Sequence, residues 1–232
     1  MASAFAVRSG RKSASGGIRC LVTAGPTREY LDPVRFLSNA SSGKMGFALA
    51  EKAAILGWEV ELVSGPVSLR PPRNVRIHRV VSAVEMLAAV EPLFRWCDIL
   101  FMVAAVADYR PAECASEKMK KSKDRLSVKM VRNPDILKHL AALRTHQTVV
   151  GFAAESQHLE DYAAEKLVRK GMDWIVANDI SRPGLGMEVD DNEIVLMSSS
   201  GVRMPFGPAP KEEVAAFILE QVRGAVGRPA RK

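Results

Sequence analysis

Residues 18–53 read IRCLVTAGPTREYLDPVRFLSNASSGKMGFALAEKA, and this stretch sets the fold expected for the 232-residue chain. Its opening run, IRCLVTA, is typical of a buried strand, and a helical pattern covers about 44–56. The segment between them, from Thr23 to Gly46, is too long for a simple turn. Long loops in compact domains are usually functional or disordered, and open α/β sheets bind ligands beyond the carboxyl ends of their strands. The sequence therefore places a candidate ligand site in this segment.

The alternation of strand and helix patterns continues along the chain. Further strands are predicted at 58–64, 75–81, 98–107, 148–154 and 173–178, and further helices at 83–95, 134–143 and 159–170. After residue 180 the pattern changes to a hairpin closed by SSSG, followed by a helix at about 211–222. Together these patterns predict a Rossmann-like open, mainly parallel α/β sheet with helices on both faces and a C-terminal antiparallel hairpin addition.

The composition is that of an ordinary globular protein, with 47% hydrophobic and 25% charged residues. The net charge of +7 comes from the two ends, because residues 1–17 hold three basic residues, residues 223–232 hold four, and neither end holds an acid. We therefore expect a disordered basic arm at 1–17, with a transit peptide as the alternative, a single domain at 18–222 and a basic tail at 223–232.

The neutral body argues against a nucleic-acid partner, and no apolar run approaches the roughly 18 residues of a membrane span, so no membrane partner is expected. Cys20, Cys97 and Cys114 lie far apart and make no metal-ligand spacing with the four histidines. Reduced thiols and a cytoplasmic location are the expectation, and the ligands of any metal stay unknown.

The end of the first long loop, SNASSGKMG, is a candidate phosphate site. It places hydroxyl groups and free backbone N–H groups at the start of a helix, where the helix dipole favours an anion. The alternative is that Ser41 or Ser42 only caps the helix. The segment fits neither the GxxxxGK[ST] nor the GxGxxG template, which weakens a nicotinamide interpretation.

A longer comparison of residues identifies a family. The run TAGPTREYLDPVRFLSNASSGKMGFALAEKA resembles the opening signature of phosphopantothenoylcysteine synthetases. The resemblance continues in order through LVSGPVSL, AAVADYRP, EKMKK, RNPDIL, VGFAAES, KLVRKGMDWIVAND and DNEIVL, over roughly residues 18–200. Bacterial relatives are commonly fused behind a flavin-dependent decarboxylase. That half is not in this sequence, so no flavin is expected.

The resemblance implies a reaction and its partners. The enzyme would activate the carboxylate of 4′-phosphopantothenate with CTP and Mg2+, release pyrophosphate, and let the L-cysteine amine displace CMP from an acyl-cytidylate. Physical argument alone leaves CTP and ATP open, because base discrimination depends on contacts that spacing does not reveal. The resemblance also implies a homodimer. The expected contacts are the hairpin after residue 180 and the loops between strands. In such a dimer the EKMKK loop of one subunit would approach the site of the other.

The resemblance also carries over site residues, position by position. Asn39 and Lys118 are the expected catalytic residues, with Asn39 at the activated carbonyl and Lys118 at a nucleotide phosphate. Nucleotide-binding residues are expected to be Gly25, Ser41, Ser42, Gly43, Lys44, Met45, Ala104, Asp108, Lys118, Pro134, Asp135, Ile136, Leu137, Phe152, Lys166 and Lys170. Substrate-binding residues are expected to be Asn39, Arg35 and Ala105.

Two other functions compete with the ligase. Tyr162 and Lys166 form the YxxxK pair of short-chain NAD(P)-dependent reductases, but the glycine fingerprint of those enzymes is absent after the first predicted strand. A nucleotide-binding regulatory subunit without catalysis is the second alternative, and retention of Asn39 and Lys118 argues against it.

Overall fold

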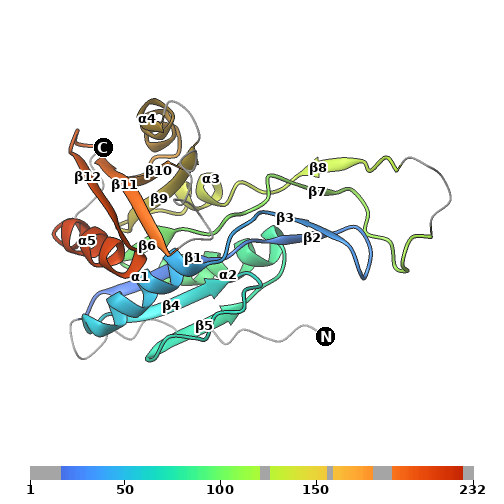
Figure 1. Ribbon diagram of the computed structural model, residues 1–232, viewed down its shortest axis with the longest axis horizontal. Coiled ribbons are helices and arrows are strands. Elements are labelled where there is room, and N and C mark those ends of the chain that lie inside the picture. The colour runs from blue at the N-terminus through green and yellow to red at the C-terminus, as the bar shows by residue number, and fades with distance from the viewer. Residues whose placement is uncertain (1–16, 121–125, 156–158, 180–189, 227–232) are drawn as a thin grey trace.

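A single eight-stranded sheet organises the computed structural model, which describes residues 17–120, 126–155, 159–179 and 190–226 (Figure 1). The strand order is β12-β11-β10-β9-β6-β1-β4-β5. Six neighbouring strands run parallel: β1 (Arg19–Ala24), β4 (Glu59–Ser64), β5 (Val75–Arg79), β6 (Ile99–Met102), β9 (Thr148–Glu155) and β10 (Trp174–Asp179). The antiparallel hairpin β11 (Asp191–Ser198) and β12 (Arg203–Pro210) adds to β10. This confirms the predicted sheet and its C-terminal addition.

Helices cover both faces of the sheet. On one face lie α1 (Lys44–Ile55) and α5 (Lys211–Arg223), and on the other lie α2 (Ala83–Trp96), α3 (Ile136–Ala141) and α4 (Leu159–Arg169). Alternate residues of β1 serve the two layers, because Cys20 and Val22 pack in the α1/α5 core whereas Leu21 packs in the other. Burial of β1 on both faces explains why Cys20, Leu21 and Val22 follow one another without polar alternation. No described helix is long and apolar enough to cross a membrane.

Two short antiparallel ribbons project from the sheet, and they were not predicted (Figure 1). One pairs β2 (Arg28–Tyr30) with β3 (Phe36–Ser38), and the other pairs β7 (Tyr109–Pro111) with β8 (Met130–Arg132). We call these two ribbons and their described connecting residues the arm, which is distinct from the N-terminal segment 1–17. Three-residue strands are too short to produce a readable alternation, so the sequence shows them only as loops.

The predicted strand at 98–107 is wrong in its second half. β6 ends at Met102, after which the backbone N–H groups of Val103 and Ala104 donate to the Thr23 hydroxyl, at 3.1 and 3.2 Å. Ala105 N then donates to the Gly25 carbonyl at 2.9 Å. The apolar residues of 103–107 therefore cross the end of β1 instead of extending the sheet.

Most other predicted boundaries lie within two residues of the observed ones. The helix predicted at 134–143 is shorter, because Asp135 is its N-cap and α3 ends at Ala141. Residues 1–16 of the predicted N-terminal basic segment and residues 227–232 of the predicted tail lie outside the described residues, whereas Arg223, the first residue of that tail, is the last residue of α5.

Candidate active site

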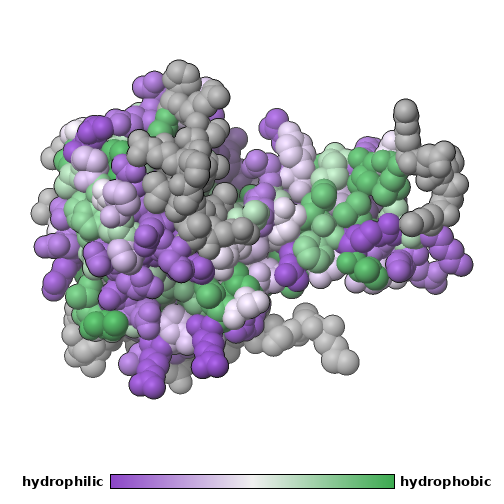
Figure 2. All heavy atoms as spheres, viewed as in Figure 1, coloured by the Kyte–Doolittle hydropathy of each residue, from purple (hydrophilic) through white to green (hydrophobic). Residues whose placement is uncertain are grey.

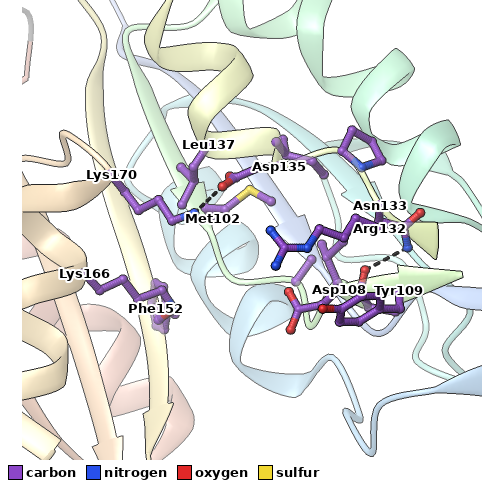
Figure 3. Close-up of a pocket in the computed structure, with 15 residues that line it drawn as sticks. Met102, Asp108, Tyr109, Arg132, Asn133, Asp135, Leu137, Phe152, Lys166 and Lys170 are labelled. Atoms are coloured by element: carbon purple, nitrogen blue, oxygen red, sulfur yellow. Dashed lines mark hydrogen bonds and ion pairs between the residues drawn. The ribbon is translucent and has the colours of Figure 1, made fainter. Parts of the chain in front are cut away.

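A cavity of about 470 Å3 opens beyond the carboxyl ends of β6 and β9, where an open α/β sheet binds its ligand (Figure 3). Its size is within the range of small-ligand pockets. Nine of the predicted nucleotide-binding residues line it: Ala104, Asp108, Pro134, Asp135, Ile136, Leu137, Phe152, Lys166 and Lys170. They come from the loop after β6, from the start of α3, from β9 and from α4. We call this cavity the pocket.

Asp108 is held at the pocket by a fixed bend of the backbone. Asn133 N donates to the Asp108 carbonyl at 2.8 Å, and the Asn133 side-chain amide donates to the Ala107 carbonyl at 2.8 Å. Arg110 donates in turn to the Asn133 side-chain oxygen at 3.0 Å. The Asp108 carboxylate itself has no hydrogen bond or ion pair with any described residue. An exposed carboxylate positioned in this way is available to accept hydrogen bonds from a ligand.

The two lysines predicted four residues apart do lie on one face of α4, and both line the pocket. Lys166 Nζ donates to the Phe152 carbonyl at 2.9 Å, whereas Lys170 pairs with Asp135. Burial by itself would raise the pKa of Asp135, but its contacts with Lys170 and Lys138 together outweigh burial and leave the pKa below its usual value. Asp135 also caps α3 by accepting a hydrogen bond from Lys138 N at 3.1 Å. Part of the positive charge of Lys170 is therefore already compensated.

The SSGKM segment leads into α1, which begins at Lys44, and none of its residues lines the pocket. The N-cap of α1 is Gly43, with φ 80°, and no side chain caps the helix, so the interpretation of Ser41 or Ser42 as a cap is wrong. Gly25 has φ 73°, and a Cβ atom there would lie 2.8 Å from a Val67 methyl carbon. The two left-handed glycines bring the end of β1 and the start of α1 together, which no other residue type does without strain.

Lys44 lies at a second cavity, of about 430 Å3, which is lined by α1, by residues 69–73 and by the start of α5. Its ammonium group pairs with Asp190 at 2.7 Å. Contact with Lys44 lowers the pKa of Asp190. The remaining predicted members of this segment, with Gly25, do not line the pocket either, so their role toward the nucleotide stays a prediction.

The expected substrate and catalytic residues are only partly brought together. The Asn39 amide donates to the Ala105 carbonyl at 3.1 Å, beside the loop that lines the pocket. Arg35 instead binds Asp32 at 2.5 Å and the Met119 carbonyl at 2.7 Å. Lys118 is exposed on the arm and does not line the pocket. The roles assigned to these residues stay predictions.

Six residues of the pocket were not among the predicted ones: Met102, Val106, Ala107, Tyr109, Arg132 and Asn133. Several belong to β7, β8 or the adjoining bends, which the sequence shows only as loops. The available signal was the RNPDIL string, in which Arg132 and Asn133 directly precede residues that were predicted. In contrast, Tyr162 is 48% exposed and does not line the pocket, so the geometry gives no support to a Tyr-Lys catalytic pair.

The chain is similar in sequence to a known protein family and to curated proteins. Residues 15–225 match the model of the family described as DNA/pantothenate metabolism flavoprotein C-terminal domain. The chain is 51% identical over 206 residues to the coenzyme A biosynthesis bifunctional protein CoaBC of Escherichia coli (strain K12), covering 87% of this chain and 50% of that protein. It is 42% identical over 207 residues to CoaBC of Bacillus subtilis (strain 168), covering 89% and 51%. The chain thus spans about half the length of the curated relatives it matches.

Solved structures agree with the sequence relatives. The C-terminal domain of a CoaBC protein superposes with a TM-score of 0.78 at 42% identity, over 90% of this chain and 95% of that domain. A Cab2 variant in complex with phosphopantothenate-cysteine superposes with a TM-score of 0.72 over 90% of this chain and 86% of the other. Its 16% identity supports a shared fold only.

Proposed function

Because the chain belongs to the family of DNA/pantothenate metabolism flavoprotein C-terminal domains, we propose that it is a phosphopantothenate-cysteine ligase of coenzyme A biosynthesis. The observation that carries the proposal is the pocket, in which nine residues from separate segments, each predicted to bind nucleotide, line one cavity. An uncompensated carboxylate and several cations in one cavity suit a ligand that carries both hydroxyl and phosphate groups.

The proposed reaction has two steps. The carboxylate oxygen of 4′-phosphopantothenate attacks the α-phosphorus of CTP, the bond to the β-phosphate oxygen breaks, and pyrophosphate leaves. The neutral amine of L-cysteine then attacks the acyl carbon, the bond to the CMP oxygen breaks, and the new amide loses a proton. Negative charge grows on phosphate oxygens in the first step, and Lys166 and Lys170 provide positive charge at the pocket. Asp108 accepts hydrogen bonds from the ribose hydroxyls.

Asn39 is proposed to act on the acyl group. Its amide already donates to the Ala105 carbonyl at 3.1 Å, which places a hydrogen-bond donor beside residues of the pocket. A neutral amide suits an acyl oxygen because it donates without adding charge. Once substrate is bound, the donor would move from the Ala105 carbonyl to the acyl oxygen.

Mg2+ is proposed to arrive with the triphosphate. Among the described residues there is no group of three or more His, Cys, Asp or Glu side chains that would hold a metal ion on its own. Mg2+ in nucleotide enzymes is usually held by one or two carboxylates and by substrate phosphates, so the triphosphate of CTP would supply most of its ligands. The bound ion would offset phosphate charge while pyrophosphate leaves.

A homodimer is proposed through the arm rather than through the C-terminal hairpin. Large apolar side chains stand exposed on the arm: Val34, Phe36, Leu37, Tyr109, Leu126 and Val128. Figure 2 shows hydrophobic residues gathered on the part of the molecule that projects away from the sheet. Contiguous exposed apolar side chains mark an interaction surface. Lys118, on the same arm, would then reach the pocket of the partner copy. Sedimentation that finds only monomer at micromolar concentration would contradict this arrangement.

The proposed location is the cytoplasm. Cys20 and Cys97 are free and buried, and free thiols are typical of proteins in a reducing compartment. The deciding experiment measures pyrophosphate release with CTP, Mg2+ and 4′-phosphopantothenate, with and without cysteine, and repeats it with ATP. Cysteine-dependent turnover to an amide product is expected with CTP. Absence of pyrophosphate release with both nucleotides would overturn the ligase proposal and favour a protein that binds nucleotide without catalysis.

A further inference from the structure

Arg132 differs from the other cations of the pocket in the contacts that its guanidinium makes. No described residue forms a hydrogen bond or ion pair with that side chain. Arg110, on the opposite strand of the same ribbon, is engaged through Nη1, which donates to the Arg132 carbonyl at 2.9 Å and to the Asn133 side-chain oxygen at 3.0 Å. One arginine of this ribbon therefore builds the bend, and the other is left to face the cavity.

The other cations of the pocket are already engaged. Lys166 donates to the Phe152 carbonyl, and Lys170 pairs with Asp135. Figure 3 shows the Arg132 guanidinium extending from β8 into the cavity, toward the side formed by these two lysines. A ligand that enters the pocket would lie between α4 and Arg132.

The charges of the pocket fit a phosphate ligand on this arginine. Three cations, Arg132, Lys166 and Lys170, line it against two carboxylates, Asp108 and Asp135. Arg132 and Asp108 both face the cavity without forming an ion pair with each other. A nucleotide satisfies both, because a carboxylate accepts hydrogen bonds from a ribose diol, whereas the planar guanidinium fork matches phosphate oxygens.

We propose that Arg132 binds a phosphate group of the nucleotide, so that Asp108 and Arg132 recognise the two chemically different parts of one ligand. This inference rests on the proposed nucleotide chemistry and adds to it a residue at the end of β8 that was not among the predicted nucleotide-binding residues. Arg132 is then a direct ligand of the nucleotide and contributes to its affinity before any chemistry occurs.

The test compares binding of cytidine with binding of CTP and Mg2+ to wild type, Arg132→Gln and Arg132→Lys, by ligand-observed NMR and calorimetry. Arg132→Gln is expected to weaken CTP about 10- to 100-fold and to leave cytidine within about twofold, because it removes a charge-assisted contact to phosphate alone. Arg132→Lys is expected to stay within about 10-fold of wild type for CTP, since it keeps the charge but loses the fork.

Lys129→Gln is the matched control. Lys129 lies just before β8, is exposed and does not line the pocket, so its loss changes the net charge of the ribbon equally. CTP affinity should change less than about twofold in this variant, since exposed charges outside a contact are screened by salt. A fall equal to that of Arg132→Gln would show that only general electrostatics is involved and would overturn the proposal.

The remaining outcomes separate the two proposals. Wild type that binds CTP more tightly than cytidine, with an unchanged preference in Arg132→Gln, would overturn the role of Arg132 and leave the ligase intact. An equal loss of cytidine and CTP would mean that Arg132 only shapes the pocket, which also overturns the proposal. Wild type that shows no preference for CTP over cytidine would overturn both the role of Arg132 and the proposed nucleotide chemistry.

Discussion

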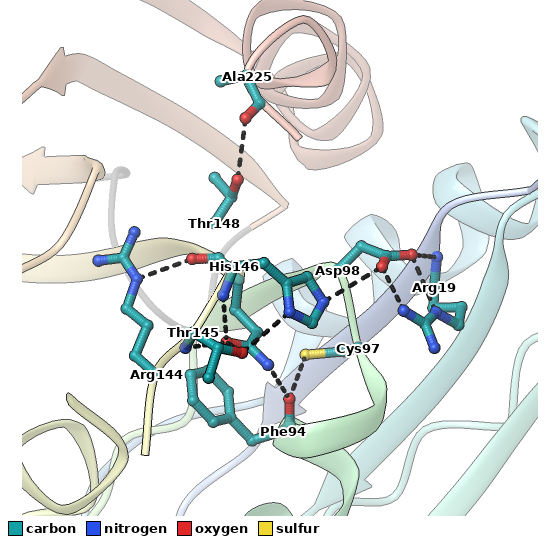
Figure 4. Close-up of polar contacts among 10 residues, drawn as sticks. Arg19, Phe94, Cys97, Asp98, Arg144, Thr145, His146, Thr148 and Ala225 are labelled. Atoms are coloured by element: carbon teal, nitrogen blue, oxygen red, sulfur yellow. Dashed lines mark hydrogen bonds and ion pairs between the residues drawn. The ribbon is translucent and has the colours of Figure 1, made fainter. Parts of the chain in front are cut away.

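Replacing Asp98 with asparagine should destabilise the sheet at the end opposite the pocket (Figure 4). Asp98 precedes β6 and accepts three hydrogen bonds from Arg19 at the start of β1, from N at 2.8 Å, Nε at 3.1 Å and Nη2 at 2.5 Å. His146, which precedes β9, lies 3.6 Å from the same carboxylate. One side chain therefore links the amino ends of three neighbouring strands.

The magnitude follows from the burial of the pair. The side chains of Arg19 and Asp98 are only 25% and 21% exposed, so solvent screens their interaction weakly. Breaking a well-buried pair costs about 3–5 kcal/mol, and a hydrogen bond to a charged group is worth about 1.5–3 kcal/mol. Asparagine keeps one acceptor oxygen but loses the charge. We expect Asp98→Asn to lower the free energy of unfolding by about 2–3 kcal/mol at pH 7.

The loss should depend on pH in a defined direction. Burial would raise the pKa of Asp98, but its bonds with Arg19 outweigh burial and hold the pKa below the usual value. Stability from a lowered carboxyl pKa is fully present above the unfolded value of about 3.9 and is lost as pH falls through the folded value. The gap between wild type and Asp98→Asn should therefore narrow below about pH 4.

Urea denaturation at several values between pH 7 and pH 3 measures this gap. The control is Glu165→Gln, which removes an i,i+4 pair to Arg169 whose side chains are 65% and 63% exposed. It should cost less than about 0.5 kcal/mol. The reasoning is refuted if Asp98→Asn costs no more than this control at pH 7, or if the gap stays constant down to pH 3.

Three further substitutions test the site and its support. Gly46→Ala should destabilise the protein by about 1–3 kcal/mol in thermal unfolding, because the added Cβ would lie 2.6 Å from the Ala24 Cβ. The control Gly224→Ala should not destabilise the protein, since its added Cβ would meet nothing within 4 Å. Equal effects of the two substitutions would contradict the packing argument. Asp108→Asn should weaken CTP binding about 10-fold and leave the melting temperature unchanged, since no described residue pairs with the carboxylate. A lower melting temperature with intact CTP affinity would instead show that the role of Asp108 is structural. Asn39→Ala should bind CTP within about threefold of wild type but form amide product about 100-fold more slowly, as expected for loss of one acyl-oxygen donor. Wild-type turnover in Asn39→Ala would remove it from the site.

The sheet was predictable because its strands and helices carry periodic patterns. In β1, which is buried on both faces, Cys20, Leu21 and Val22 follow one another without a polar residue, and β4 carries apolar residues at Val60, Leu62 and Val63, although its Glu61 is also buried. The C-terminal hairpin carried a turn signal in SSSG, and the structure places β11 and β12 on either side of it. The residues within each of these elements were therefore sufficient to predict it.

The error at 98–107 has a tertiary cause. Val103 and Ala104 are as apolar as the residues of β6, but the Thr23 hydroxyl binds their N–H groups and turns the chain out of the sheet. Thr23 is about 80 positions earlier in the sequence, so no local pattern at 103–107 contains this information. The same holds for the arm, where buried Asp32 accepts hydrogen bonds from Arg35 and from Met119 N.

The sequence by itself determined the fold class, the strand order along the chain, the family and most residues of the pocket, because these follow from periodicity and from collinear motifs. Only the tertiary structure decided which residues share a cavity and which charges remain uncompensated there. Lys170 and Arg132 are both cations in the sequence, but folding brings Asp135 to Lys170 and leaves Arg132 facing the pocket. The physical reason is that compensation of a charge depends on distances between segments far apart in the chain, which residue spacing does not contain.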